Sequence, residues 1–292
     1  MTLTNENTAI VMDSTADFPS AQERYPNMRV VPLYVNFGAE SLRDFVELDP
    51  HTFYARLRTE AATPTTSQPT PQDFLTTYEE LSAYERVYSL HISSRLSGTH
   101  GSATLAAQEA ASQGVGGDRI RVIDSESVSV GISMLALGIH RLLEEGTTDA
   151  EIEALAGSYA QRSGLLFTVD TLEFLVKGGR IGRAKALAGS LLNVKPILTI
   201  ANGEVVPLTR VRGRGRQKAL QEFRRRFEAA TTEEGDLHVG IAHAEADEAV
   251  AQLQALVLEA RPQAQIELVT SLGAVVGTHA GPGTIGFFWF QD

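Results

Sequence analysis

Short apolar runs alternate with amphipathic stretches along the first half of the chain. The runs at 8–12, 86–92 and 119–123 have the length and composition of buried strands. Between them lie stretches with apolar residues at helical spacing, one of which, 99–113, is rich in alanine. Strands that alternate with helices in this way predict βαβ units on a parallel sheet.

Capping residues predict where several helices begin. Asp49 followed by Pro50, and Thr70 followed by Pro71, are typical of helix N-termini. Two further helices are predicted at 128–144 and 149–163 from their apolar spacing. A strand region at 28–37 contains a proline, which indicates a strand edge or a strand start.

The pattern changes near residue 160. Strand-like segments at 195–200 and 204–211 flank Asn202-Gly203, a strong hairpin signal. Further strands at 165–169, 238–242, 266–269 and 284–290 are interrupted by helices at 217–229 and 247–260. We therefore expect two α/β domains, the N-terminal one (1–160) with a parallel sheet and the C-terminal one (161–292) with a mixed sheet.

Composition narrows the functional classes. The 292 residues, 43% of them hydrophobic, are enough for one large domain or two ordinary ones. There is no apolar window long enough to cross a membrane and no secretory signal, so we expect a cytoplasmic protein without stable membrane insertion. The absence of cysteine excludes disulfides and thiol catalysis. A net charge of −11 argues against binding nucleic acid through its phosphates.

Three polar motifs stand out beside the apolar sequence: 65–69 (TTSQP), 93–99 (SSRLSGT) and 277–283 (GTHAGPG). They offer small hydrogen-bond donors and glycines, and none carries a carboxylate or a cluster of metal ligands. If the fold brings them together, the result is a donor-rich pocket without a strong base. Such a pocket suits binding an anion better than breaking a bond, and it needs no metal or cofactor.

Ser97 lies between a predicted strand and the alanine-rich helix, where serine commonly acts as the N-cap. Capping alone would account for it. The same position would also suit an anion site, because a helix N-terminus presents unpaired N–H groups. In parallel sheets, ligands bind at the carboxyl ends of the strands, which is where Ser97 is expected.

Thr66 and His279 each have a structural alternative as well. Thr66 precedes Gln68-Pro69, and we expect a loop with exposed hydroxyls there, which an ordinary connector would also provide. His279 is flanked by glycines, which permit close approach of either a ligand or packed backbone.

Taken together, the motifs resemble those of the DegV family, and the resemblance spans nearly the whole chain. It rests on seven segments in order: 13–17 (DSTAD), 66–69 (TSQP), 93–99 (SSRLSGT), 124–127 (DSES), 177–182 (KGGRIG), 192–197 (LNVKPI) and 278–283 (THAGPG). Members of this family are bacterial fatty-acid-binding proteins with two α/β domains and the lipid site between them. Several serve as the acyl-carrying subunit of fatty acid kinase.

The resemblance implies a set of site residues. Thr66, Ser97 and His279 would surround the carboxylate of a long-chain fatty acid, with no cofactor, and an apolar tunnel would bury the acyl chain. Candidate tunnel walls are apolar residues near the domain junction, each of which could equally be ordinary core: Leu165, Phe167, Leu172, Phe174, Leu187, Leu191, Leu192 and Ile197.

Two basic segments fit the resemblance less directly. The segment 177–183 (KGGRIGR) has neither P-loop spacing nor the dinucleotide fingerprint, and we interpret it as a turn that places Arg180 for a domain contact. Arginines also alternate at Arg210, Arg212, Arg214 and Arg216. In extended chain they would share one side, either as a solvated edge strand, as a docking surface for an acidic partner, or as charge compensation for an acyl phosphate. The resemblance favours docking, because family members meet a kinase near their carboxylate site.

The resemblance favours a carrier that is not itself an enzyme and that presents the carboxylate for phosphorylation by a separate ATP-binding kinase subunit. Neither a P-loop nor the kinase loop set is present. One alternative is a hydrolase that uses Ser97 and His279, although no G-x-S-x-G elbow surrounds Ser97 and no acid is evident beside His279. The other is a small-ketone-binding phosphotransfer subunit similar to the substrate domain of dihydroxyacetone kinase.

Overall fold

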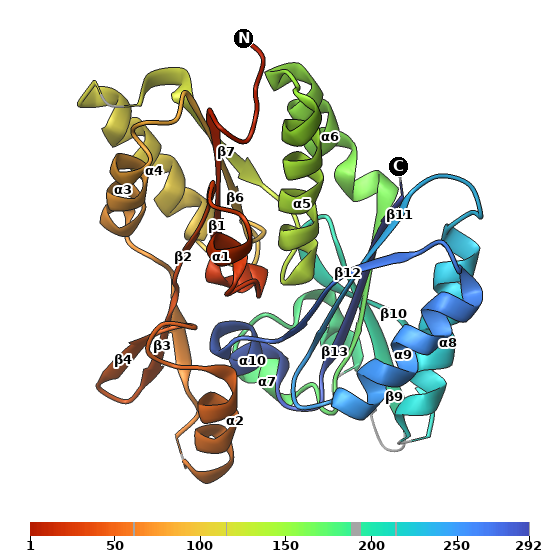
Figure 1. Ribbon diagram of the computed structural model, residues 1–292. Coiled ribbons are helices and arrows are strands. Elements are labelled where there is room, and N and C mark those ends of the chain that lie inside the picture. Colours follow the sequence, from red (N-terminus) through yellow and green to blue (C-terminus); the bar gives the residue numbers. More distant parts are fainter. Residues whose placement is uncertain (61, 115, 188–193, 214, 292) are drawn as a thin grey trace.

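The N-terminal half contains a four-stranded sheet in which all neighbours are parallel (Figure 1). The computed structural model describes residues 1–60, 62–114, 116–187, 194–213 and 215–291. The order of the strands is β2-β1-β6-β7, with bounds β1 Thr8–Asp13, β2 Met28–Val31, β6 Arg86–His91 and β7 Ile120–Asp124. The parallel sheet predicted for this half is confirmed.

The C-terminal half contains a six-stranded mixed sheet, as predicted, in the order β10-β9-β8-β13-β11-β12. Among the strands that the structure describes, β11 and β12 pair in parallel and the other neighbours in this sheet are antiparallel. The predicted hairpin forms at Asn202 and Gly203, whose φ angles of 51° and 74° suit its tight turn. The strands are β8 Ser163–Thr168, β9 Val194–Ala201, β10 Glu204–Arg212, β11 Leu237–His243, β12 Gln265–Ser271 and β13 Ile285–Gln291.

Strand β1 shows why the parallel sheet is buried on both sides. Ala9 and Val11 pack in a core beneath α3 (Pro71–Glu80) and α4 (Thr99–Ser112). Ile10 and Met12 point to the opposite face, toward α5 (Val130–Glu145). Alternate residues of a strand face opposite sides, so a strand covered by helices on both faces is apolar throughout.

Helix α5 forms the layer between the two sheets (Figure 1). It contacts β1 on one side and β11 and β13 on the other. Helix α6 (Asp149–Arg162) also packs against β8 and β13. One apolar core therefore reaches from the first sheet to the second, and a domain boundary at residue 160 stays a prediction.

The outer face of the second sheet is covered by α8 (Arg216–Ala230) and α9 (Asp247–Ala260). Phe287 and Trp289 of β13 pack there with Phe227 of α8, with the Phe227 ring edge-on to both. The molecule is thus a stack of helix, sheet, helix, sheet and helix layers, as Figure 1 shows.

A small antiparallel sheet, β4-β3-β5, was not predicted. It consists of β3 (Tyr34–Phe37), β4 (Glu40–Arg43) and β5 (Thr65–Ser67) and lies beside α2 (Pro50–Thr59). The strand expected at 28–37 breaks at Pro32, so its second part joins this sheet instead of the parallel one. The loop expected at Thr66 is also corrected, because the extended geometry that precedes Pro69 is used to pair with β3.

The remaining elements are short: α1 (Ala21–Arg24), α7 (Glu173–Lys177), α10 (Ala274–Ala280) and the 3₁₀ turns Ser14–Ala16, Gly117–Arg119 and Gly182–Leu187. Helix α10 lies between the small sheet and the second sheet (Figure 1). Within the described ranges, the helices are all too short or too polar to cross a bilayer.

Candidate functional site

A cavity of about 380 Å³ lies between the two halves of the molecule. Its lining includes Leu33, Thr15, Ile92 and Val128, each of which follows one of the four parallel strands. The cavity therefore lies at the carboxyl ends of these strands, the usual ligand position in parallel sheets. The opposite wall comes from α10 and from β8, β9, β10 and β13 of the second sheet.

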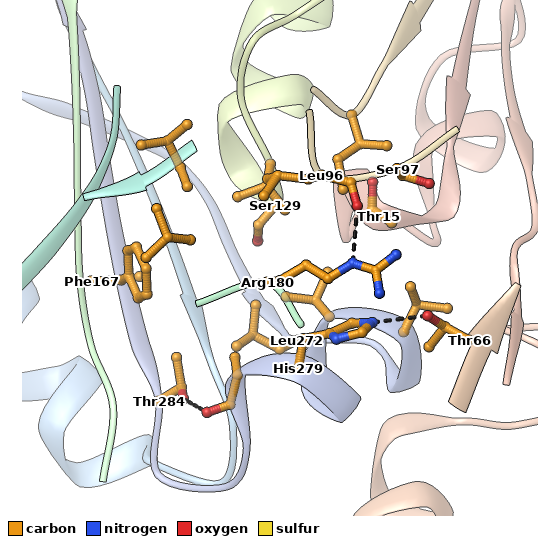
Figure 2. Close-up of a pocket in the computed structure, with 18 of the residues that line it drawn as sticks. Thr15, Thr66, Leu96, Ser97, Ser129, Phe167, Arg180, Leu272, His279 and Thr284 are labelled. Atoms are coloured by element: carbon orange, nitrogen blue, oxygen red, sulfur yellow. Dashed lines mark hydrogen bonds between the residues drawn. The ribbon is translucent and has the colours of Figure 1, made fainter. Parts of the chain in front are cut away.

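Thr66, Ser97 and His279 all line this cavity (Figure 2). The Oγ1 of Thr66 lies 2.8 Å from Nε2 of His279, although the two residues are 213 positions apart. Strand β5 supplies Thr66, and α10 supplies His279 near its C-terminal end. The fold thus brings together side chains from both halves of the chain at one end of the cavity, which we call the polar end.

Ser97 lies at the polar end in the loop that leads into α4, but it is not the N-cap that the sequence predicted. Gly98 occupies that position, without a side-chain cap. The hydroxyl of Ser97 instead accepts a hydrogen bond from the backbone N–H of Thr99 at 3.3 Å and pairs with the Thr99 hydroxyl at 2.8 Å. Serine competes for such local bonds two residues onward, and here that bond takes the place of a helix cap.

His279 is held in its neutral form by its surroundings. Burial lowers the pKa of its imidazole to about 4, and the nearby positive charge of Arg180 acts in the same direction. The buried Nδ1 has no hydrogen-bond partner within the described part of the chain. A Cβ atom at Gly178 would lie 2.1 Å from this nitrogen, so only glycine leaves room for the ring.

Arg180 places a cation beside the polar end. Its Nε donates to the carbonyl oxygen of Leu96 at 3.1 Å, and its Nη1 donates to that of Gly178 at 2.7 Å. The first of these bonds joins the 177–183 turn to the first half of the chain, and the domain contact of Arg180 stays a prediction, as the domain boundary does. The sequence did not reveal that Arg180 also lines the cavity, between Leu96 and His279 (Figure 2). Both hydrogen bonds go to neutral carbonyls, which leaves its charge available to an anion.

Two buried carboxylates hold the N-terminus of α10. Asp17 accepts a hydrogen bond from the N–H of Gly273 at 2.7 Å, and Asp44 accepts one from the N–H of Ala274 at 2.8 Å. The hydroxyls of Ser129 and Ser14 donate to these carboxylates in turn. Burial raises the pKa of Asp44 to about 7 and the pKa of Asp17 well above its ordinary value. The first half of the chain thus anchors the helix that carries His279.

A second buried network supports the cavity wall but cannot act as a nucleophile. His91 lies 3.1 Å from Asp13 through Nδ1 and 2.7 Å from Ser89 through Nε2. These three side chains have the order of a catalytic triad, but all are wholly buried and none lines the cavity. Asp13 also accepts hydrogen bonds from Thr15 and from the N–H of Ile92, and both residues line the cavity.

The geometry does not support a hydrolase built on Ser97 and His279. The hydroxyl of Ser97 pairs with Thr99, and the imidazole of His279 pairs with Thr66. No acid orients Nδ1 of His279 within the described ranges. The same ranges contain no cluster of three histidine, aspartate or glutamate side chains that could hold a metal ion.

The end of the cavity away from Thr66 is mostly apolar, and the hydroxyl of Thr284 on that side is bound to the carbonyl oxygens of Ala280 and Gly281 (Figure 2). The predicted walls contribute to this end only in part. Leu165 and Phe167 line it, whereas Leu172, Phe174, Leu187 and Ile197 are not among its lining residues, and Leu191 and Leu192 lie outside the described residues. Ile197 points into the core under α8, while Ile200 on the other face of β9 reaches the cavity. Other apolar lining residues were not predicted: Val128, Val130, Leu175, Val205, Val275 and Val276.

Arg210 and Arg212 are exposed on β10, an edge strand of the second sheet. Because they are two positions apart on a strand, their side chains lie on the same side of it, as predicted. Arg214 lies outside the described residues. Arg216 begins α8 and pairs with Asp170 at 3.4 Å, so it does not extend the row on the strand.

Comparisons with known proteins agree on one family. The family model described as an uncharacterised protein of the DegV family matches residues 7–292. The DegV domain-containing protein of Deinococcus radiodurans is 37% identical over 282 residues, which cover 95% of this chain and 96% of that protein. A solved structure described as fatty acid binding of a DegV family protein from Thermus thermophilus has a TM-score of 0.89 and 40% identity, and the match covers 98% of this chain and 100% of that one.

The fold is also that of a more distant protein. The Streptococcus pneumoniae fatty acid kinase (Fak) B3 protein loaded with linoleic acid has a TM-score of 0.85 at 23% identity, with 98% of this chain and 100% of that one covered. At this identity the likeness concerns the fold alone.

Proposed function

Since the chain belongs to the DegV family, we propose that it binds a long-chain fatty acid in this cavity. The observation that carries the proposal is the two-ended lining, with hydroxyls, an imidazole and a guanidinium at one end and aliphatic and aromatic side chains at the other. A fatty acid has the same division between carboxylate and tail. A volume of about 380 Å³ also lies within the range of about 300–1,000 Å³ that is usual for ligand pockets.

The acyl chain would supply most of the binding free energy. Each buried methylene contributes about 0.8 kcal/mol, so a chain of about 16 carbons contributes roughly 12 kcal/mol before the costs of ordering are subtracted. The apolar wall formed by Leu165, Phe167 and Ile200 suits such a tail better than a small ketone. The tail therefore determines retention, and the polar end determines orientation.

At the polar end, Thr66 and Ser97 would donate hydroxyl hydrogen bonds to the carboxylate. We infer that the neutral His279 carries its proton on Nε2, because a proton on Nδ1 would be a buried donor without an acceptor. His279 then donates to Thr66 and leaves the hydroxyl proton of Thr66 free for the ligand. Hydrogen bonds to a charged group contribute roughly 1.5–3 kcal/mol each.

The bound carboxylate would then be presented to a separate ATP-binding kinase subunit in the cytoplasm. In that reaction a carboxylate oxygen attacks the γ-phosphorus of ATP, which yields an acyl phosphate and ADP. Among the described residues that line the cavity there are several donors and one cation, Arg180, but no carboxylate that could act as a base. This supports a division of labour in which this chain binds and orients the acid and the partner transfers the phosphoryl group. Arg210, Arg212 and Arg214 are candidates for kinase docking.

Native mass spectrometry of the freshly purified protein tests the binding proposal, with gas chromatography of the extracted ligand to identify it. We expect a mass excess that corresponds to one long-chain fatty acid per protein. The proposal is wrong if the purified protein carries no lipid and the delipidated protein also takes up none when hexadecanoic acid is added.

A further inference from the structure

The described strands of the six-stranded sheet contain three glycines, and two of them are explained by packing. A Cβ atom at Gly164 would lie 2.1 Å from the indole ring of Trp289. One at Gly240 would lie 3.1 Å from the Met134 side chain of α5. At both positions a neighbouring side chain occupies the space that a larger residue would need.

Gly286, the third of these glycines, has no such neighbour. The nearest atom to a Cβ at this position would be the carbonyl oxygen of Ala242 at 3.7 Å, which is ordinary van der Waals contact. Its backbone is extended within β13 and is not in the positive-φ region. Neither packing nor backbone conformation therefore requires glycine. Because glycine weakens a strand interior, its presence there often marks a place where a ligand approaches closely.

The position of Gly286 indicates which part of a ligand would fill the space beside this residue. Gly286 lines the cavity, and in the antiparallel pairing of β13 with β8 it lies directly beside Phe167. Figure 2 shows Phe167 on the opposite side of the cavity from Thr66 and Ser97. Gly286 therefore lies at the apolar end, where the tail of a ligand held at the polar end would reach.

We propose that Gly286 sets the length of acyl chain that the cavity accepts, because its missing side chain leaves room for the last methylenes of the tail. This inference rests on the proposed function. A Cβ atom at residue 286 would project into the cavity beside Phe167 without displacing protein atoms. It would therefore exclude the end of a long tail and leave a shorter tail unaffected.

Competition among fatty acids of different length tests the inference. The delipidated wild-type protein and the variants Gly286→Ala and Gly286→Val are each mixed with equimolar dodecanoic, tetradecanoic, hexadecanoic and octadecanoic acid, and the bound acids are quantified by native mass spectrometry. We expect Gly286→Val to shift the preference toward the shorter acids. Each excluded methylene reduces the affinity about four-fold, so a loss of two methylenes reduces the binding of octadecanoic acid about 15-fold relative to dodecanoic acid.

A matched control is Gly157→Ala, on an exposed position of α6 with open space around it, which is expected to keep the wild-type preference. Gly286→Ala adds a single methyl group and decides the question if Gly286→Val does not fold; it is expected to shift the preference in the same direction by a smaller factor. An unchanged preference, or an equal loss at all four lengths, overturns the inference. If the wild-type protein binds none of the four acids, the proposed function itself fails.

Discussion

At the scale of single residues, the central feature is a neutral histidine in a site proposed to bind an anion. Burial keeps the pKa of His279 near 4, so the imidazole contributes a hydrogen bond and no charge at neutral pH. The negative charge of a carboxylate would therefore be compensated by the hydroxyls of Thr66 and Ser97 and by the guanidinium of Arg180.

Removing the hydroxyl of Thr66 or of Ser97 should affect fatty acid binding less than it affects phosphorylation of the bound acid by the kinase. In Thr66→Ala and Ser97→Ala we expect fatty acid affinity to fall about ten-fold or somewhat more, since one charge-assisted hydrogen bond is lost and the tail remains buried. We expect the rate of phosphorylation by the kinase subunit to fall more strongly, because the carboxylate is no longer fixed in position. Binding assays and kinase turnover measure the two effects.

Ser158→Ala, at a half-buried position of α6 outside the cavity lining, is a suitable control for the loss of a hydroxyl. Unchanged kinase turnover in both cavity variants would contradict the assignment of Thr66 and Ser97 to the carboxylate.

Gly178 offers a test of His279 that leaves the histidine itself in place. In Gly178→Ala the new Cβ would lie 2.1 Å from Nδ1, so the ring must move and its hydrogen bond with Thr66 is expected to break. The φ of −75° at Gly178 suits alanine, and the fold should survive. NMR of the His279 imidazole should show a shifted signal together with weaker fatty acid binding. Gly101→Ala, in open space on α4, should change neither, and an unshifted signal in Gly178→Ala would refute the close contact.

Sequence alone singled out three residues that line the cavity. Thr66, Ser97 and His279 could be singled out because small donors and glycines stand out beside apolar sequence, and because their motifs resemble those of a family. The roles of Gly178 and of Arg180 at the cavity could not be predicted in this way. They depend on the close approach of the 177–183 turn to α10 and to Leu96, and no local pattern encodes contacts between such distant segments.

At the scale of elements, α10 depends on the rest of the molecule. Its seven residues are too few for a stable isolated helix, and carboxylates more than 200 positions away bind its first amides. The shift in the pKa of Asp44 makes this anchoring dependent on pH. The carboxyl has a pKa of about 7 in the folded protein and about 3.8 when unfolded, so between these values the folded state binds the proton more tightly.

The contribution of Asp44 to stability is therefore complete below pH 4 and is lost as the pH rises through 7. We expect the free energy of unfolding to fall between about pH 4 and pH 7 and to level off above pH 7, with a contribution from Asp44 of at most about 4 kcal/mol over its whole titration. Asp44→Asn should flatten this dependence, since an amide can accept from Ala274 without ionising. Denaturant unfolding at several pH values checks this, and an equal slope in the variant would rule out Asp44 as its source. Asp149→Asn, on a carboxylate that pairs with Arg86, serves as the control.

Elements were predictable where the local pattern was long. The parallel strands, the capped helices that begin after Asp49 and Thr70, and the hairpin at Asn202-Gly203 all follow from spacing and turn chemistry. The three-residue strand β5 and the helix α10 could not be predicted in this way. Each is too short to show a repeating hydrophobic pattern, and each is stabilised by tertiary contacts. These two elements position Thr66 and His279.

At the scale of the whole molecule, the cavity forms because two sheets pack on opposite sides of one layer of helices, and this layer ends where the cavity begins. Helix α5 fills the space between the sheets, and Val128, Ser129 and Val130 line the cavity where this helix begins. Beyond this end, the loops after the parallel strands face α10 and the second sheet. The mixed architecture was predictable from the alternation of elements, whereas the volume and direction of the cavity depend on packing between the halves.

The proposed docking of a kinase subunit involves the outer surface of the molecule. Arg212→Glu reverses a charge on an exposed edge strand, and we expect it to reduce kinase turnover several-fold while fatty acid affinity stays unchanged. The effect should diminish at high ionic strength, because exposed charges are screened. Arg225→Glu, on the exposed face of α8, is the matched control. Turnover that falls equally in both variants would indicate a general effect of charge and not docking through β10.

The most direct measurement is the crystal structure of the protein with bound hexadecanoic acid. We expect the carboxylate within hydrogen-bonding distance of the hydroxyls of Thr66 and Ser97, and the tail extended past Leu165 and Phe167 toward Gly286. A ligand bound outside this cavity, or one with its carboxylate at the Phe167 end, would contradict the account.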